Sequence, residues 1–500
     1  MRNFKYQTTA CLLAVIIIMN SCKLESETYD SINTGIFPTT ENDAKALVTA
    51  NAYGVFQNNG YGGMFNIATG ILLVSDLMSD YGECTWRGWQ PILYNRWIVD
   101  NNYNNNHWRW AKFMGKITMT LDRIENMDIN DDVKNQFLAQ LHCARGWLAF
   151  CMYDLYGPIP IADVEILKNP LEEKVVPRLS EEEMQKFIVS ELEKAATVLP
   201  YSYKKGDADY GRFTKGLCNM VLLKFYMQTK QWDKAETIGR ELTKPEYAYE
   251  LVPNYADIFT LANEKNSETI WAVNCLRGTQ EHKWHPHVLP NDYPTDPPGV
   301  VKWNGFKISW DFFNTFENGD KRLETIISEY TGTGNKKHSQ EIDTENGGLL
   351  KYGAVPLKYE IDKGTTGENN EIDYIIYRYA DALTLLSEAI VRNGNTITQE
   401  AVELLNRVRT RAGLAAYKLS DFANTRDFLD KLLLERGHEL YYEGCRRQDL
   451  IRDDAYVDAI KRKCVIAGEK TLVNKNYHRI PLPQYVINEG LGQIKQNPGY

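Results

Sequence analysis

Residues 139–163, AQLHCARGWLAFCMYDLYGPIPIAD, decide how the rest of the chain is interpreted. Apolar residues recur here at steps of three and four, which is the spacing of one face of an α-helix. This face is made up of Phe137, Leu141, Ala144, Leu148, Cys151 and Leu155. Gly157 and Pro158 then end the helix, because glycine adopts the turn and proline cannot continue the helix. The stretch therefore predicts a well-buried helix of about five turns, followed by an extended connection.

The composition is that of a globular protein large enough to bury a sizeable core. Of the 500 residues, 43% are hydrophobic and 25% are charged. The formal net charge is −9 and no basic block stands out, so we expect no nucleic-acid partner. The 30 Tyr, 17 Phe and 11 Trp are a high aromatic load, and their local clusters mark candidate ligand sites.

The N-terminus has the features of a targeting segment. Arg2 and Lys5 supply positive charge, and an apolar run over residues 11–19 follows. Nine residues are too few to span a bilayer, so the run is typical of a signal peptide and not of a transmembrane helix. We predict that the signal peptide covers residues 1–21.

A lipid anchor is expected directly after the signal peptide. Ser21 precedes Cys22, which resembles the lipobox of bacterial lipoproteins, although Met19 stands where leucine is usual. Lipid (palmitate) on Cys22 would anchor the chain without a transmembrane helix, and residues 22–40 would form a lipidated linker. A plain secretory signal with an incidental cysteine is the alternative.

The remaining cysteines show no disulfide pattern. Seven of the nine are left when Cys11 and Cys22 are set aside, and they form no C-x-x-C pair. Cys143 and Cys151 are eight residues apart on one predicted helix, which is too far for a disulfide. An odd, scattered set argues against a disulfide framework, so we expect mostly buried thiols.

Helical patterns at both ends enclose an irregular part. Helix-type periodicity covers about 41–245 and 371–500, whereas Gly, Pro, Asn and Asp recur in about 246–370. The short apolar runs of the irregular insertion predict small hairpins. Because both helical sets need partners, we predict a single, mainly α domain over residues 41–500.

One predicted helical hairpin resembles a tetratricopeptide (TPR) unit. Its helices cover residues 211–228 and 231–242 with almost no loop between them, and Trp232 and Ala235 lie one turn apart. A unit of this kind cannot bury its apolar face alone. Several such hairpins should therefore stack on one another.

Ordered motifs along the chain resemble those of the SusD/RagB family. The helix over residues 139–163 has the form of the family's early hallmark helix. The later matches are Arg212 to Lys215, Glu268 to Trp271, Asp320 with Arg322, Arg378 to Ala389, Asn406 to Gly413, Glu435 to Leu450, Ile480-Pro481 and Gln496 to Tyr500. Motifs in this order are far more specific than any one of them.

The resemblance implies a fold, a location and a function. It implies a SusD-like domain in which TPR-like hairpins pack with a loop-rich half. It also implies a surface lipoprotein of the outer membrane that binds glycan and passes it to a SusC-like TonB-dependent barrel. It implies no enzymatic activity and no cofactor. The alternatives are a receptor for peptide or another nutrient, an exported glycan-acting enzyme, and a TPR scaffold without a small ligand.

The best candidate for a ligand site is the turn-rich segment over residues 76–97. An aromatic plate stacks on the apolar face of a sugar, while Asp, Asn or Arg bonds its hydroxyl groups. We predict ligand contacts from Asp76, Tyr81, Trp86, Arg87 and Trp89. The alternative for the tryptophans is packing beneath their own loop, and Trp97 is expected in the core.

A second candidate wall lies in the proline-rich segment over residues 284–303. We predict ligand contacts from Tyr293 and Trp303, because prolines hold exposed aromatic rings rigid and so lower the cost of ordering on binding.

Catalytic and metal sites are weaker hypotheses. The chain has no G-x-S-x-G, H-E-x-x-H or P-loop motif. His282, His285 and His287 have a spacing that suits zinc, but a solvated loop without metal is the favoured interpretation. Three glutamates lie four residues apart on one helix, and we interpret them as an ion-pair network with nearby arginines and not as a catalytic pair. They are Glu435, Glu439 and Glu443.

Overall fold

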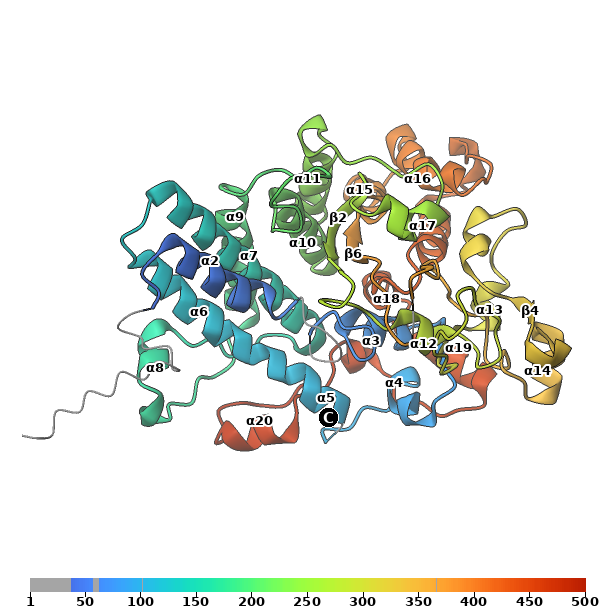
Figure 1. The fold of residues 1–500 in the computed structure, drawn as a ribbon, viewed down its shortest axis with the longest axis horizontal. Helices are drawn as coiled ribbons and strands as arrows, with labels where there is room; N and C mark the ends of the chain where they lie inside the picture. The colour runs from blue at the N-terminus through green and yellow to red at the C-terminus, as the bar shows by residue number, and fades with distance from the viewer. Residues whose placement is uncertain (1–36, 57–62, 101, 366) are drawn as a thin grey trace, which may run out of the picture.

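The computed structural model describes residues 37–56, 63–100, 102–365 and 367–500. The predicted signal peptide and Cys22 lie outside these residues. The described chain is mainly helical, as predicted, and its buried apolar side chains form one continuous core. Figure 1 shows most of the N-terminal helices on the left and most of the C-terminal helices on the right. Between them lie α10 (Lys215–Gln228), α11 (Trp232–Leu242) and α15 (Tyr379–Gly394).

Residues 139–156 belong to the longest described helix, α7 (Asp131–Tyr156). The side chain of Asn130 caps its first turn, and Gly157 ends it with a φ of 76°. The neighbours of α7 include α2 (Glu41–Val48), α6 (Lys112–Glu125) and α9 (Glu181–Ala196). The C-terminal tail returns to its end, where Ile480 N–H donates to the Leu155 carbonyl at 2.8 Å.

The TPR-like hairpins stack as the sequence predicts. The first hairpin is α10 (Lys215–Gln228) with α11 (Trp232–Leu242), and the second is α15 (Tyr379–Gly394) with α16 (Gln399–Arg411). Helix α11 lies against α15. Gly239 permits this close approach, because a Cβ there would lie 2.9 Å from the Leu386 side chain.

The remaining helices are short or C-terminal. Helix α2 continues as a π-helical turn over Thr49–Tyr53. The C-terminal set is α17 (Thr425–Glu439), α18 (Arg446–Arg452), α19 (Tyr456–Ala467) and α20 (Gln484–Glu489). The short helices are α3 (Ile71–Leu77), α4 (Gln90–Leu93), α5 (Asn102–Trp108), α8 (Val164–Lys168), α12 (Trp284–Val288), α13 (Trp310–Phe313) and α14 (Gln340–Asn346).

The strands differ from the predicted small hairpins. Only β4 (Glu329–Thr331) and β5 (Lys337–Ser339) form a local hairpin among the described residues. The other two antiparallel pairs join distant segments: β1 (Gly82–Cys84) with β3 (Phe306–Ile308), and β2 (Thr269–Val273) with β6 (Tyr374–Arg378). Strand β6 also moves the start of the later helical part from about residue 371 to Tyr379.

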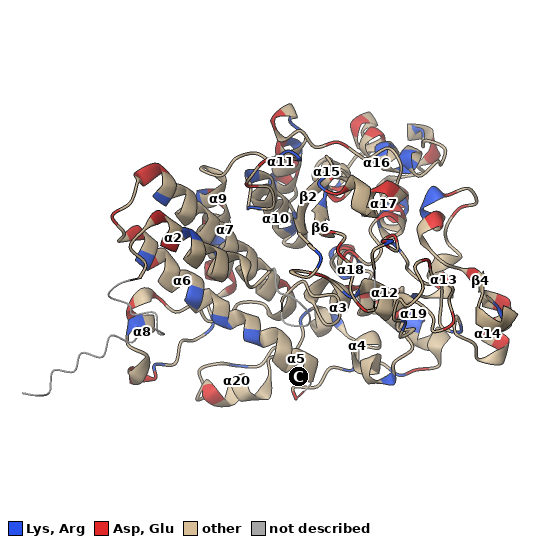
Figure 2. Cartoon of the chain, in the orientation of Figure 1, with Lys and Arg blue, Asp and Glu red and all other residues tan. Residues whose placement is uncertain are grey.

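The burial of the cysteines and the distribution of charged residues agree with what the sequence predicts. Of the seven cysteines in the described part, all are free and six are buried, as predicted. No helix among the described residues is both long and apolar enough to cross a bilayer. Figure 2 shows acidic and basic residues interspersed over most helices, without a basic face in this view.

Candidate functional site

The two predicted aromatic walls meet in the structure. Strand β1 pairs with β3 so that Cys84 lies opposite Phe306. The pairing continues one step further, where Thr85 N–H donates to the Gly305 carbonyl at 3.0 Å. Helix α4 contacts β1 and α12 contacts β3, and both helices lie in the lower right part of Figure 1. The segment that carries Trp86 therefore lies directly beside the segment that carries Trp303.

Trp86 is held in place by contacts on several sides. Its indole N–H donates to the Trp303 carbonyl at 3.2 Å. Its ring meets His287 and Phe306 edge to face, with centroids 5.7 and 5.4 Å away. A Cβ on Gly305 would lie 2.5 Å from the Trp86 ring, so only glycine leaves room for it. The side chain is nevertheless half-exposed, which leaves part of a fixed indole open to solvent.

The structure corrects the prediction that Trp89 contacts a ligand, because Trp89 packs beneath its own loop, whereas Trp303 is partly exposed. Trp89 is only 6% exposed and packs on Tyr103 and Phe306, with centroids 4.6 and 5.5 Å away. Trp303 is half-exposed and meets His287 edge to face at 4.9 Å. We call these six side chains the aromatic platform: Trp86, Trp89, Tyr103, His287, Trp303 and Phe306.

The structure corrects the prediction that Asp76 and Tyr81 contact a ligand. Both are fully buried. One Asp76 carboxylate oxygen accepts from Gly444 N–H at 2.6 Å, and the Tyr81 hydroxyl accepts from Tyr442 N–H at 2.9 Å. Burial raises the pKa of Asp76 to about 7. These residues fix the turn between α17 and α18 to the segment before β1 and do not reach solvent.

Arg87 is exposed to solvent, whereas Tyr293 packs against another aromatic ring. Arg87 is exposed between Trp86 and Trp89, so its predicted ligand contact remains open. Tyr293 is half-exposed, but it packs against Tyr330 of the β4–β5 hairpin with centroids 5.2 Å apart. The structure thus brings Trp86, Arg87, Trp89 and Trp303 together and places Tyr293 in a separate aromatic contact.

The three histidines are buried, which corrects the prediction of a solvated loop. His282, His285 and His287 are 7%, 0% and 3% exposed. His285 bonds the Tyr359 carbonyl at 3.1 Å and the Asn370 side chain at 3.0 Å. Burial lowers their pKa values to about 3, 4 and 4 respectively, so they are neutral at pH 7.

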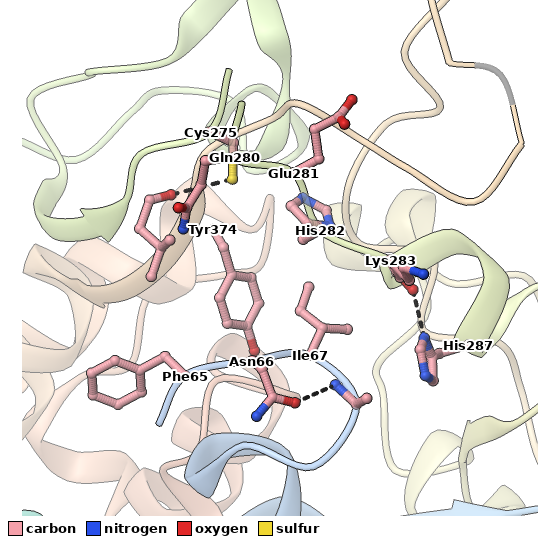
Figure 3. Close-up of a pocket in the computed structure, with 12 residues that line it drawn as sticks. Phe65, Asn66, Ile67, Cys275, Gln280, Glu281, His282, Lys283, His287 and Tyr374 are labelled. Carbon is pink, nitrogen blue, oxygen red and sulfur yellow. Dashed lines mark hydrogen bonds between the residues drawn. The ribbon is translucent and has the colours of Figure 1, made fainter. Parts of the chain in front are cut away.

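Two of these histidines, His282 and His287, border a small cavity and not a ligand-sized one. Figure 3 shows His282 and His287 on one side of it and Phe65 to Ile67 on the other. Its volume of about 20 Å³ suits a water molecule and not a sugar. In the described ranges, no group of three His, Cys, Asp or Glu side chains is placed to hold a metal ion.

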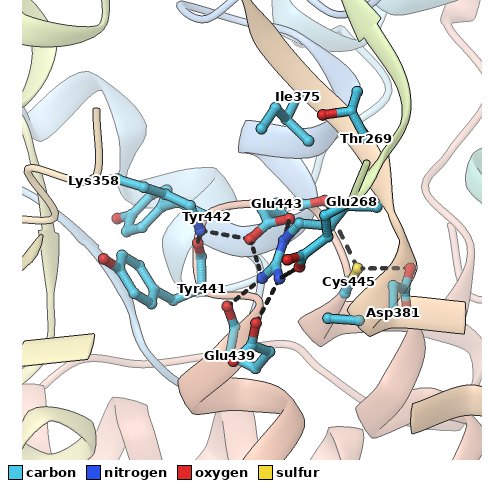
Figure 4. A network of polar contacts seen from close by, with 12 residues as sticks. Glu268, Thr269, Lys358, Ile375, Asp381, Glu439, Tyr441, Tyr442, Glu443 and Cys445 are labelled. Carbon is cyan, nitrogen blue, oxygen red and sulfur yellow. Dashed lines mark hydrogen bonds and ion pairs between the residues drawn. The ribbon is translucent and has the colours of Figure 1, made fainter. Parts of the chain in front are cut away.

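The three glutamates form a buried ion-pair network, as predicted. Figure 4 shows Glu268, Glu439 and Glu443 close together, and Arg378 forms ion pairs with all three. Arg378 bonds Glu443 at 2.7 Å and Glu268 at 2.7 Å. Burial alone would raise the pKa of Glu439, but Arg411, Arg378 and Arg322 lower it to about 2. Each of Glu435, Glu439 and Glu443 is buried and lies in an ion pair with an arginine, so the three carboxylates are closed to a substrate.

Sequence reasoning missed three members of the platform and the glycine beneath it. Tyr103, His287 and Phe306 line the tryptophans, and Gly305 gives room to Trp86. The sequence contains no signal for them, because their roles follow from the β1–β3 register.

Comparison with known proteins agrees with the fold and the motifs. Residues 267–500 match the model of the SusD family. The C-terminal part of the chain is thus similar to the SusD family. A SusD-like protein of Bacteroides ovatus is 23% identical, with 73% of this chain and 68% of that protein covered. The starch-binding protein SusD of Bacteroides thetaiotaomicron is 22% identical, with 84% of this chain and 83% of that protein covered.

Solved structures share the SusD-like fold. One is surface glycan-binding protein A of Bacteroides thetaiotaomicron, in complex with laminarihexaose. It is 21% identical, covers 92% of this chain and 100% of its own, and has a TM-score of 0.73. A laminarin-binding SusD-like protein is 20% identical, covers 92% of this chain and 100% of its own, and has a TM-score of 0.74. At these identities the likeness establishes the fold.

Proposed function

We propose that this SusD-like protein is a lipid-anchored surface receptor that binds glycan on the aromatic platform. It would then deliver the glycan to a TonB-dependent outer-membrane transporter. The observation that carries the proposal is the half-exposed indole of Trp86, held against the Trp303 carbonyl at 3.2 Å. Relatives named for starch and laminarin binding support the choice of glycan as the ligand.

The platform has the properties that sugar binding requires. A pyranose ring has an apolar face of C–H groups, and an indole face buries it efficiently. Trp86 is fixed before binding, so little side-chain entropy is lost when the sugar stacks. Arg87 is exposed next to Trp86 in the sequence and offers guanidinium donors to the hydroxyl rim, whereas the Gln90 amide donates to Glu469 at 3.4 Å. Binding needs no catalytic group, and the proposal contains no chemical step.

The test is direct binding of soluble residues 23–500 to a panel of glycans, followed by calorimetry with any glycan that binds. Trp86→Ala should weaken binding about tenfold or more, as expected for a central aromatic contact. Trp310→Ala is a matched control, because Trp310 is also half-exposed and its indole N–H also donates to a carbonyl, that of Leu350 at 2.8 Å. Equal losses in the two variants, or binding to peptides but to no glycan, would contradict the proposal.

The tests of the lipid anchor and of the delivery step are carried out in cells. Metabolic labelling with an alkyne fatty acid should mark the full chain and should not mark a Cys22→Ala variant. Uptake of a fluorescent form of the bound glycan by the native bacterium should fall in both the Cys22→Ala and the Trp86→Ala strains. Unchanged uptake in both strains would contradict delivery to a transporter.

A further inference from the structure

Each of the two chain segments that meet at Trp86 carries one cationic side chain that forms no ion pair among the described residues. Arg87 follows Trp86, and Lys302 precedes Trp303. The 3.2 Å hydrogen bond between the Trp86 indole and the Trp303 carbonyl joins the two segments. Arg87 is exposed and Lys302 is half-exposed. Within the described part of the chain, neither side chain forms an ion pair.

The segments of the platform contain no acidic residue. Residues 85–90, 102–106 and 298–305 hold Arg87 and Lys302 but neither Asp nor Glu. The whole chain, by contrast, has 66 acidic and 57 basic residues. These three ranges therefore carry a net charge of +2 on a protein that is negative overall, with Glu83, Asp100 and Asp296 each two residues before one of them. Exposed cations attract anions to a surface.

Neighbouring charges do not cancel the two cations. Glu368 follows Gly367, whose carbonyl accepts from Val301 N–H at 2.8 Å, so this carboxylate borders the Trp303 segment. Lys283 neutralises Glu368 at 2.6 Å. On the other side, Glu469 lies 3.4 Å from Arg96. Both carboxylates are thus already paired, and the charge on Arg87 and Lys302 remains.

We propose that the platform selects anionic glycans, in which a sugar ring stacks on Trp86 and its carboxylate or sulfate ester meets Arg87 and Lys302. This inference rests on the proposed function and names the substrate class of the same site. A guanidinium bonds the oxygens of a carboxylate or sulfate through two parallel N–H groups. The contact adds a charge requirement to stacking, which by itself accepts any sugar with an apolar face.

The test compares charged glycans with neutral counterparts of the same backbone, using soluble residues 23–500. Polygalacturonate is compared with its fully methyl-esterified form, and dextran sulfate with dextran. Tighter binding of polygalacturonate alone assigns a uronate, and tighter binding of dextran sulfate alone assigns a sulfate ester. Binding of the preferred anionic glycan should weaken about five- to tenfold in Arg87→Gln, and further in the double variant with Lys302→Gln.

Arg123→Gln and Lys205→Gln are the matched controls, because both side chains are exposed on segments outside the platform. Equal losses in these controls would mean non-specific attraction and would overturn the inference. Neutral glycans that bind as tightly as charged ones, and that need Trp86 but not Arg87, would also overturn it and would leave the proposed function intact. Binding to no glycan at all would overturn both.

Discussion

The indole N–H of Trp86 donates a hydrogen bond to the backbone carbonyl of Trp303, 217 residues further along the chain, at 3.2 Å. The bond fixes the orientation of Trp86 and joins the two segments that form the aromatic platform. A backbone acceptor is independent of the Trp303 side chain. Loss of the Trp303 ring should therefore remove a stacking surface without releasing Trp86.

Gly305→Ala should displace Trp86. The added Cβ would fall 2.5 Å from the Trp86 ring and 2.6 Å from the His287 carbonyl, so the ring or the strand must shift. We expect a loss of unfolding free energy of about 1–3 kcal/mol, as for overpacking, together with weaker glycan binding. Gly88→Ala is the control, because a Cβ there meets nothing within 4 Å. Wild-type affinity in Gly305→Ala would show that the position of Trp86 is unimportant.

The two tryptophans of the first wall should behave differently. Trp89 is 6% exposed and packed on two rings, so Trp89→Ala should cost about 3–5 kcal/mol of unfolding free energy. Trp86 is half-exposed, so Trp86→Ala should cost less stability and remove more glycan affinity. Urea denaturation and calorimetry on both variants separate the two effects. The reverse order of stability losses would contradict the assignment of Trp89 to the core.

Arg378 should be essential for the fold. It is fully buried and is bonded to Glu268 and Glu443, each at 2.7 Å. Arg378→Met leaves these carboxylates buried without their cation, which should cost about 3–5 kcal/mol of unfolding free energy. The exposed control Arg240→Met removes surface ion pairs with Glu236 and Glu400 and should cost about 1 kcal/mol or less. Similar denaturation midpoints for the two variants would argue against a stabilising network.

Asp76 should make stability depend on pH. Burial raises its folded-state pKa to about 7, whereas an unfolded chain has a value of about 3.9. The folded state therefore keeps the proton longer than the unfolded state. The stabilising contribution is complete below about pH 4 and is lost as the pH rises to about 7, with a slope of at most about 1.4 kcal/mol per unit.

Asp76→Asn tests this dependence. The amide stays neutral, and its oxygen can still accept from Gly444 N–H. The stability difference between wild type and variant, measured by urea denaturation from pH 4 to 8, should shift in favour of the variant as the pH rises. A difference that is constant with pH would mean that Asp76 does not titrate in this range.

Local signals in the sequence were sufficient for most helices. The apolar spacing of residues 139–163 predicts α7, and the spacing of Ser180 and Glu183 predicts the capping box that begins α9. Trp232 and Ala235 mark the second helix of a stacked TPR-like hairpin. Each of these signals depends on residues within a few turns of one another, which is why a single sequence carries them.

The site depends on contacts between distant segments and was only partly predictable. Aromatic residues in turn-rich chain pointed to Trp86 and Trp303, but the β1–β3 register that joins them leaves no local pattern. Asp76 resembles an exposed polar residue until its partner, the N–H of Gly444, is known. The histidine segment resembles a solvated loop for the same reason, because its burial is set by distant residues such as Tyr359 and Asn370.

The most direct test of the account is ¹⁹F NMR of the protein labelled with 5-fluorotryptophan, titrated with the glycan that binds best. The chain has 11 tryptophans, and single Trp→Phe variants assign the signals of Trp86, Trp303 and the control Trp310. The account predicts that saturation with glycan shifts the signals of Trp86 and Trp303 and leaves that of Trp310 unchanged. Unshifted signals from Trp86 and Trp303, with glycan demonstrably bound, would contradict the central claim that this platform is the binding site.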